Sequence, residues 1–287
     1  MSILANGSSG PFKCGIVLHP AGHTRSPAMH RAAYQSLGLN ASYEAYDVPP
    51  ERLAEAAKQF RAEGIRQFAV SIPHKESMMA FVDELEPVGR AIGAINTVTL
   101  DGDRWIGTNT DWIGALRALE RIQPVSGQRA VVLGAGGTAR ALTFALRERD
   151  CEVFVLNRTL ERAEALARDL DATGTGGLDR LHDLAPDILV NTTSVGLNED
   201  RSPVSADHLR EDMVVLDAVY APEQTRLLRD AQACGAKTVG GKWMLVHQAV
   251  EQLRRWTSLL PSPPSEAALA EIAATMALAF DEAGQSA

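Results

Sequence analysis

The sequence has little of what marks disulfide-bonded, membrane-spanning or nucleic-acid-binding proteins. Its three cysteines are scattered among 287 residues, too few for a disulfide framework, and we expect buried free thiols in a reducing cytoplasm. No apolar run approaches the roughly 18 residues of a membrane span. A net charge of −8 without a basic run argues against nucleic acid as a partner. Residues 1–10 lack the charged and apolar regions of a signal peptide, so a loose tail is expected there.

What is present is the composition of an ordinary globular protein. Hydrophobic residues make up 45% of the chain and charged residues 22%, which suits a protein with a substantial core. The length exceeds that of one average domain and favours two.

A β-α-β unit lies near the middle of the chain. Residues 130–133 form a short valine-rich run, a helical pattern follows, and residues 153–156 repeat the strand pattern. Between them, Gly134, Gly136 and Ala139 fit the fingerprint G-x-G-x-x-G/A. Its glycines let the backbone approach a pyrophosphate at the N-terminus of a helix. A glycine triplet alone is often only a tight turn, but its place between strand and helix predicts dinucleotide binding.

The end of the second strand of this unit indicates which dinucleotide binds. It carries Asn157, Arg158 and Thr159, with Arg162 one helical turn later and no acid at the strand tip. An NAD site usually has Asp or Glu there for the ribose 2′-hydroxyl, whereas arginine binds a 2′-phosphate. The alternative is a solvated helix start on an Arg/Glu surface. The local chemistry predicts NADP as the cofactor.

Strand and helix patterns along the rest of the chain predict an α/β fold with two lobes. Strands are expected at residues 12–18, 42–48, 68–72, 94–100, 104–109, 188–190, 214–218 and 237–239. Helices are expected at 26–37, 50–63, 75–85, from 111, and at 223–233, 244–259 and 266–282, the first with Ser26 as its N-cap. The alternation beyond residue 111 is typical of a doubly wound parallel sheet.

These patterns divide the chain into three segments. Residues 1–110 are expected to form the first part of a mixed α/β substrate domain, and residues 111–240 a doubly wound Rossmann-type NADP domain. The helices of residues 241–287 are expected to pack back on the first domain, which makes that domain discontinuous.

Three polar stretches lie at predicted strand ends of the first domain. They are residues 22–27, 71–76 and 93–97, the last continued by 107–111. Their hydroxyl, amide, lysine and carboxylate groups suit a polyhydroxylated small molecule. Each residue also has an ordinary alternative role: Ser26 as a helix cap, Asn96 as a turn residue and Lys75 as a solvated helix start.

In their order along the chain, these motifs resemble the shikimate dehydrogenase family, whose members reduce 3-dehydroshikimate reversibly with NADP. The resemblance runs from about Ile16 to Gln248. It rests on eight motifs: His-x-x-Ser-Pro (23–27), Ile-Pro-His-Lys-Glu (72–76), Gly-Ala-Ile-Asn-Thr (93–97), Asn-Thr-Asp (109–111), Gly-Ala-Gly-Gly (134–137), Asn-Arg-Thr (157–159), Asn-Thr-Thr-x-x-Gly (191–196) and Met-Leu-Val-x-Gln (244–248).

The resemblance implies a role for each matching residue. Lys75 and Asp111 would be the catalytic pair, and Thr24 and Ser26 would hold the substrate carboxylate. The substrate pocket would be completed by Ser71, Asn96, Tyr220 and Gln248, although packing is an alternative role for the last two. The cofactor would be held by Gly134, Ala135, Gly136, Gly137 and Thr138 at the pyrophosphate, by Asn157, Arg158, Thr159 and Arg162 at the adenosine phosphate, and by Ala218 and Gly241 near the nicotinamide. No metal ion is expected.

The sequence departs from the family pattern in four places. Thr24 replaces the usual serine, Ser71 the usual threonine and Ala69 the usual asparagine, and Lys242-Trp243 stand where smaller residues are common. The first two changes either cancel sterically or reshape the pocket.

The resemblance therefore implies an NADP-dependent shikimate dehydrogenase of aromatic amino acid biosynthesis, cytoplasmic and either a monomer or a homodimer. One alternative is a quinate/shikimate dehydrogenase that uses either nicotinamide cofactor. Another is a weakly catalytic sensor that binds NADP. An intact Lys75 and Asp111 weigh against the sensor, because a binding module does not need that pair.

Overall fold

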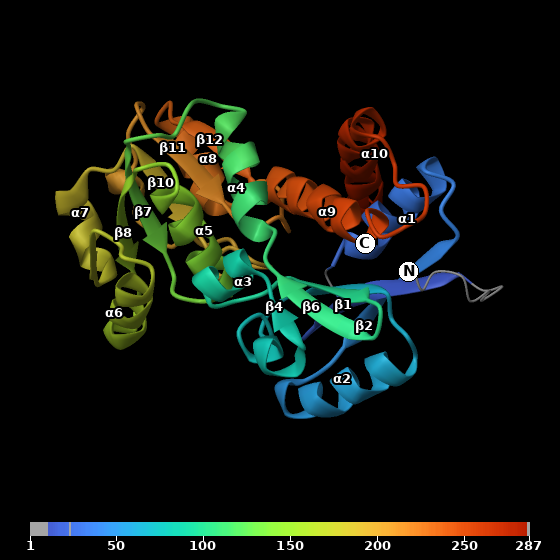
Figure 1. Cartoon of the computed structure of the whole chain (residues 1–287). Helices are drawn as coiled ribbons and strands as arrows, with labels where there is room; N and C mark the ends of the chain where they lie inside the picture. The colour runs from blue at the N-terminus through green and yellow to red at the C-terminus, as the bar shows by residue number, and fades with distance from the viewer. Residues whose placement is uncertain (1–10, 23, 286–287) are drawn as a thin grey trace. The chain divides into compact units, whose positions relative to one another are not determined.

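The computed structural model describes residues 11–22 and 24–285 (Figure 1). The tail expected at residues 1–10 and His23 of the first motif lie outside the described residues. The chain separates into two compact units. The first contains the described residues up to Thr110 and from Gln248 onward, and the second contains Asp111–His247. In the described part of the chain, no helix combines the length and the apolar character needed to cross a membrane.

The first unit is built on a mixed sheet of six strands in the order β2-β1-β3-β5-β6-β4. The strands are β1 (Phe12–Leu18), β2 (Ala41–Asp47), β3 (Gln67–Val70), β4 (Glu84–Leu85), β5 (Thr97–Asp101) and β6 (Arg104–Thr108). β1 pairs in parallel with β2 and β3, whereas β5 is antiparallel to β3 and β6. The predicted β5–β6 hairpin is confirmed. Gly102 in its turn has φ +59°, a left-handed conformation that favours glycine.

Helices cover both faces of this sheet. They are α1 (Ser26–Ser36), α2 (Leu53–Ala62, preceded by the 3-10 turn Pro50–Arg52), α3 (Pro87–Ile92), the later part of α9 (Gly241–Thr257), and α10 (Glu266–Gln285). Phe60 of α2 packs edge-on against Phe68, which packs in turn against Trp105. On the other side, α1 packs against α10, and Arg25 at the start of α1 lies 4.2 Å from the ring centre of Phe280.

Two local predictions in this unit are wrong. Residues 75–85 do not form an α-helix; they contain a 3-10 helix, η3 (Ser77–Phe81), followed by β4. Pairing of β4 with β6, and a 2.7 Å hydrogen bond from the Trp105 N–H to the Asp83 carboxylate, override the helical pattern. Ser26 is not an N-cap either. Arg25 occupies that position without a side-chain cap, and Ser26 is the first helical residue.

The second unit contains a six-stranded parallel sheet in the order β12-β11-β10-β7-β8-β9. Its strands are β7 (Arg129–Leu133), β8 (Glu152–Leu156), β9 (Gly174–Gly176), β10 (Ile188–Asn191), β11 (Val214–Asp217) and β12 (Lys237–Gly240). The order of strands reverses between β7 and β10, as in Rossmann folds, where the ligand binds at the carboxyl ends of the strands.

Helices flank this parallel sheet too. They are α4 (Asp111–Glu120), α5 (Gly137–Arg147), α6 (Leu160–Asp169), α7 (Leu181–Leu184), α8 (Arg226–Ala233) and the first part of α9, with short 3-10 turns at Leu178–Arg180 and Ala206–His208. The fold class predicted from the sequence, α/β with a doubly wound Rossmann-type domain, is confirmed. The last helix but one begins at Gly241 rather than near Met244. The two glycines at residues 240 and 241 therefore end a strand and begin a helix without a loop.

Candidate active site

Several predicted substrate residues meet at one edge of the sheet in the first unit. The His19 N–H donates to the Ile72 carbonyl (3.0 Å), so the segments that follow β1 and β3 lie side by side. The Ile95 N–H donates to the Lys75 carbonyl (2.8 Å), which places the segment of Lys75 next to that of Asn96. Backbone hydrogen bonds therefore gather these loops independently of their side chains.

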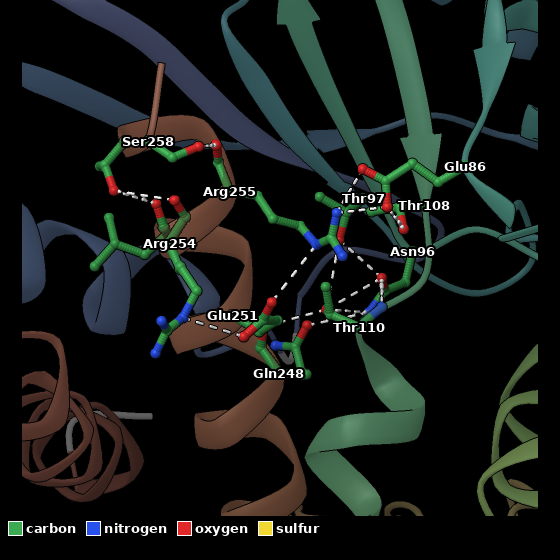
Figure 2. A network of polar contacts seen from close by, with 12 residues as sticks. Glu86, Asn96, Thr97, Thr108, Thr110, Gln248, Glu251, Arg254, Arg255 and Ser258 are labelled. Atoms are coloured by element: carbon green, nitrogen blue, oxygen red, sulfur yellow. Dashed lines mark hydrogen bonds and ion pairs between the residues drawn. The ribbon is translucent and has the colours of Figure 1, made fainter. Parts of the chain in front are cut away.

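Asn96 is the centre of a polar network shown in Figure 2. Its side chain is buried, with only 2% of the residue exposed. The amide oxygen accepts from the Thr97 hydroxyl (2.8 Å) and from the Thr110 N–H (2.7 Å). The amide nitrogen donates to the Thr110 hydroxyl (3.1 Å) and to the Gln248 side-chain oxygen (3.2 Å). Two residues predicted to bind substrate, Asn96 and Gln248, are therefore held in contact.

Further contacts tie α9 to the β5–β6 hairpin. The Gln252 amide donates to the Asn96 carbonyl (3.2 Å). One turn along α9, Arg255 forms an ion pair with Glu86 (2.5 Å), and Glu86 also accepts from the Thr108 hydroxyl (2.8 Å). Figure 2 shows Arg255 of α9 reaching toward Glu86, with Thr108 of the hairpin beside it. The orientation of Gln248 thus depends on contacts along the helix that carries it.

The start of α1 presents two hydroxyls. The Thr24 hydroxyl oxygen accepts from the Ser26 N–H (3.3 Å), which leaves its hydrogen available. Ser26 is 3% exposed, and within the described residues its hydroxyl has no hydrogen-bond partner. The hydroxyl of the half-buried Ser71 also has no hydrogen-bond partner among the described residues. A helix-capping role for Ser26 is excluded, and these hydroxyls fit a ligand that accepts hydrogen bonds.

The predicted catalytic residues belong to different units. Lys75 is half-buried in the turn before η3, and the buried ring of His74 anchors that turn through a 2.7 Å hydrogen bond to the Val48 carbonyl. Burial lowers the pKa of His74 below its ordinary value. Asp111 is 5% exposed and opens α4, where a carboxylate is favoured by the helix N-terminus. Tyr220 is half-buried beyond β11. The pairing of Lys75 with Asp111 stays a prediction.

The glycine loop of the second unit has the form that a pyrophosphate needs. Gly134 has φ +111°, and a Cβ there would lie 2.7 Å from the Thr192 hydroxyl oxygen, so only glycine fits. Gly136 is the N-cap residue of α5, and no side chain caps that helix. Ala135, Gly137 and Thr138 complete the loop and are partly exposed. A loop without side-chain bulk leading to an uncapped helix fits a dinucleotide phosphate.

One arginine contacts this loop, and a second stands in the turn that follows β8. The Asn157 amide donates to the Thr159 carbonyl (2.9 Å) and shapes the turn after β8. Arg162 donates to the Ala135 carbonyl (3.3 Å) and is thereby held against the glycine loop. Arg158 is exposed, and among the described residues it forms no ion pair. The arrangement fits a 2′-phosphate.

A third group of residues lies at the ends of β10 and β11. Asn191 and Asp217 end these strands, and the Asn191 amide donates to the Asp217 carboxylate (2.9 Å). A Cβ on Gly241 would lie 2.6 Å from the Ala218 carbonyl oxygen, so the start of α9 touches the end of β11. The sequence patterns did not single out Asp217. The available signal was an acidic residue that ends an apolar strand at the carboxyl edge of the parallel sheet.

Trp243, one of the departures from the family pattern, packs against the core of the second unit and contacts Arg121, the residue after α4. The Arg121 guanidinium lies 3.8 Å from its ring centre, and the Lys242 ammonium lies 5.5 Å away. The large side chain at this position is therefore accommodated by cation–π contacts within the second unit.

Comparison with known proteins agrees with this arrangement. The family described as shikimate dehydrogenase substrate binding domain matches residues 16–98, and the family described as shikimate / quinate 5-dehydrogenase matches residues 117–199. The chain belongs to the shikimate dehydrogenase family.

Three known proteins illustrate how similar this chain is to its relatives. The shikimate dehydrogenase (NADP(+)) of Thermococcus kodakarensis is 46% identical over 86% of this chain and 91% of its own length. The shikimate 5-dehydrogenase of Thermus thermophilus, solved in complex with NADP(H) and shikimate, is 40% identical. It superimposes with a TM-score of 0.81 over 92% of this chain and 99% of its own. A 5-ketofructose reductase of a Gluconobacter species is 32% identical, with a TM-score of 0.80 over 95% and 99% of the two chains.

Proposed function

We propose that this protein is an NADP-dependent shikimate dehydrogenase, which reversibly reduces 3-dehydroshikimate to shikimate for aromatic amino acid biosynthesis. The observation that carries the proposal is the polar network around Asn96. It assembles neutral donors and acceptors from β5, α9 and the loop at Thr110 beside the segment of Lys75. A polyhydroxylated ring needs groups of this kind. The relatives that act on shikimate support the same substrate.

The cofactor site occupies the second unit, and the residues present fit NADP. Gly134, Ala135, Gly136, Gly137 and Thr138 hold the pyrophosphate. Asn157, Arg158, Thr159 and Arg162 hold the adenosine phosphate, and Ala218 and Gly241 lie near the nicotinamide. The open glycine loop supports the first set, and two arginines at a strand tip that carries no acid support the second.

The reaction divides between cofactor and protein. When bound, NADPH would supply the hydride that the C3 carbon of the substrate accepts. Lys75 and Asp111 supply the matching proton to the C3 oxygen, and the reverse reaction returns it. The hydroxyls of Thr24 and Ser26 donate to the substrate carboxylate, while Ser71, Asn96, Tyr220 and Gln248 complete the pocket around the ring.

A substrate assay tests the proposal. NADP- and NAD-linked oxidation of shikimate and quinate should be measured side by side, with reduction of 5-ketofructose included because a reductase of that compound shares the fold. We expect the highest kcat/KM with shikimate and NADP. A higher value for quinate, or equal use of NAD and NADP, would favour the broader quinate/shikimate dehydrogenase. NADP binding without turnover of any of the three compounds would favour a sensor.

The catalytic pair has its own test. A positioned acid contributes about 10²–10⁴-fold to turnover, so Lys75→Ala should lower kcat by that order and leave NADPH binding intact. Asp111→Asn should lower it too. The double variant should lose much less than the two single losses combined, because the residues act as one unit. Lys58→Ala, which removes an exposed lysine on α2, is the matched control. Additive losses would argue against a coupled pair.

The finer expectations concern assembly and location. We expect a monomer or a homodimer in the cytoplasm, with no nucleic acid or membrane partner. Light scattering of the purified protein tests the oligomeric state.

A further inference from the structure

Asp217 is a buried acidic residue to which the proposed reaction gives no role. It closes β11 and is 0% exposed. One carboxylate oxygen accepts from the Asn191 amide (2.9 Å) and from the Val219 N–H (3.0 Å). The other accepts from the Thr225 hydroxyl (2.7 Å). Each of these contacts brings a donor to the carboxylate, as an ionised group requires.

These contacts join three segments at the cofactor edge of the second unit. Asn191 ends β10, and its own amide oxygen holds Thr193 through the backbone N–H (3.0 Å) and the hydroxyl (2.7 Å). Thr225 caps α8 by accepting from the Leu228 N–H (3.3 Å). The Val219 N–H belongs to the segment that carries Ala218 and Tyr220. Asp217 thus fixes the ends of two neighbouring strands and the start of a helix at once.

The position of Asp217 in the sheet assigns it to one half of the cofactor site. The doubly wound sheet has two mononucleotide-binding halves on either side of the point where strand order reverses. The glycine loop and the arginines mark the half of β7, β8 and β9 as the adenosine half. The other half consists of β10, β11 and β12. The nicotinamide is therefore expected at the carboxyl ends of these strands, where Asp217 lies.

The charge of Asp217 is not neutralised locally. No basic side chain of the described residues donates to its carboxylate or contributes to its pKa. Burial raises the pKa of Asp217 to about 6, although its three hydrogen bonds act to lower it. The two arginines of α8 are exposed and form ion pairs with other carboxylates. Arg226 pairs with Asp230, and Arg229 pairs with Asp200. At neutral pH this half of the sheet therefore contains a buried negative charge.

We propose that Asp217 is a positioning residue of the nicotinamide half of the site, and that its buried negative charge favours binding of the oxidised over the reduced cofactor. The proposal rests on the proposed function, which places the nicotinamide near Ala218. The oxidised nicotinamide ring carries a positive charge and the reduced ring does not, whereas the phosphates are common to both. A fixed charge in a medium of low dielectric constant therefore acts on the ratio of the two affinities.

The test is the ratio of the dissociation constants for NADPH and NADP+, each measured by equilibrium binding to the full chain at pH 8. In Asp217→Asn the amide oxygen still accepts from Asn191 and Val219, and the amide nitrogen donates to the Thr225 hydroxyl oxygen, so the shape is kept and the charge removed. The preference for NADP+ should fall by about 5–30-fold relative to wild type.

Two further variants separate charge from structure. Asp187→Asn removes an exposed carboxylate at the opposite end of β10, where it accepts from the Arg129 N–H, and should leave the ratio unchanged. Thr225→Val removes a hydrogen bond to Asp217 but keeps its charge at pH 8, so it should also keep the ratio. If Asp217→Asn does not fold, the ratio for the wild type at pH 5 and pH 8 replaces it, because protonation removes the same charge.

The possible outcomes are distinct. A wild type that binds neither NADP+ nor NADPH contradicts the proposed function itself. A wild type that binds both, with a ratio that neither Asp217→Asn nor acid changes, overturns the inference and leaves the function standing. A ratio lost equally in Asp217→Asn and Thr225→Val also overturns it, because the effect would then be structural.

Discussion

Replacing Asp217 by asparagine should change the way in which stability depends on pH, whether or not cofactor is present. Burial raises the pKa of this carboxyl from 3.8 to about 6, and hydrogen bonds from Thr225, Val219 and Asn191 oppose the rise. Folding therefore favours the protonated form. The stability associated with this form is fully present below pH 3.8 and is lost as the pH rises through about 6.

The magnitude follows from the shift. One pKa unit corresponds to about 1.4 kcal/mol, so the rise from 3.8 to about 6 makes ionisation of Asp217 destabilise the folded protein by roughly 3 kcal/mol at pH 8. About half of this change falls between pH 5 and pH 8. In domains of similar size 1 kcal/mol moves the melting temperature by roughly 2–4 °C, so the pH-dependent part amounts to about 3–6 °C.

The assay is the melting temperature of wild type and Asp217→Asn without cofactor at pH 5 and pH 8. All other titrating groups are common to both proteins, so their difference isolates Asp217. Between pH 5 and pH 8, the melting temperature of the variant should rise by about 3–6 °C relative to that of the wild type. Asp187→Asn, which removes an exposed carboxylate, should gain nothing. A difference between Asp217→Asn and wild type that is equal at the two pH values would refute the reasoning.

Three further substitutions test other parts of the site. Arg158→Ala should weaken the binding of NADPH by roughly 10–150-fold and the binding of NADH little, because only NADPH carries the 2′-phosphate. An equal loss of affinity for both cofactors in binding titrations would contradict the assignment. Ser26→Ala should raise KM for shikimate more than it lowers kcat, and the melting temperature should stay constant. A stability loss of about 1 kcal/mol, typical of a lost helix cap, would contradict the substrate-binding role of Ser26. Ala69→Asn should change the ratio of kcat/KM for shikimate and quinate more than Thr24→Ser does, and the reverse order in steady-state kinetics would show that the carboxylate end decides selectivity.

The fold was predictable where apolar runs and turns coincide. The runs at 130–133, 153–156 and 214–218 contain strands of one parallel sheet, and nearly all of their positions are buried because helices cover both faces of such a sheet. β9 (Gly174–Gly176) was missed, since a strand of two glycines and a threonine has no apolar pattern and exists through its pairing with β8. The helix expected at 75–85 failed for the same reason: tertiary pairing outweighed a local pattern.

The site was predictable as far as motifs carry it. The glycine loop and its neighbouring arginines follow from spacing and charge, and the structure gives the loop the expected open geometry. The residues that hold the named ones in place were not predictable. Thr110 binds both Asn96 and the Gln248 carbonyl, and Arg255 binds Glu86 from 169 positions away in the chain. Such pairs join segments remote in sequence, so no local pattern indicates them.

The departures from the family pattern differ in what they change chemically. Thr24 still offers a hydroxyl, and its oxygen accepts from the Ser26 N–H as a serine oxygen would, so the added methyl alters shape and not the number of donors. At Ala69 an amide has been lost altogether. This residue pairs with Thr97 across the sheet, and the Thr97 hydroxyl donates to Asn96. Ala69 is also 5% exposed, so its neighbours already cover the position. In the proposed pocket, the loss of this amide removes a donor and an acceptor from the end of β3 next to Ser71, while Thr24 and Ser26 keep the hydroxyls assigned to the substrate carboxylate. We therefore expect selectivity among polyhydroxylated acids to be decided on the β3 side of the proposed pocket.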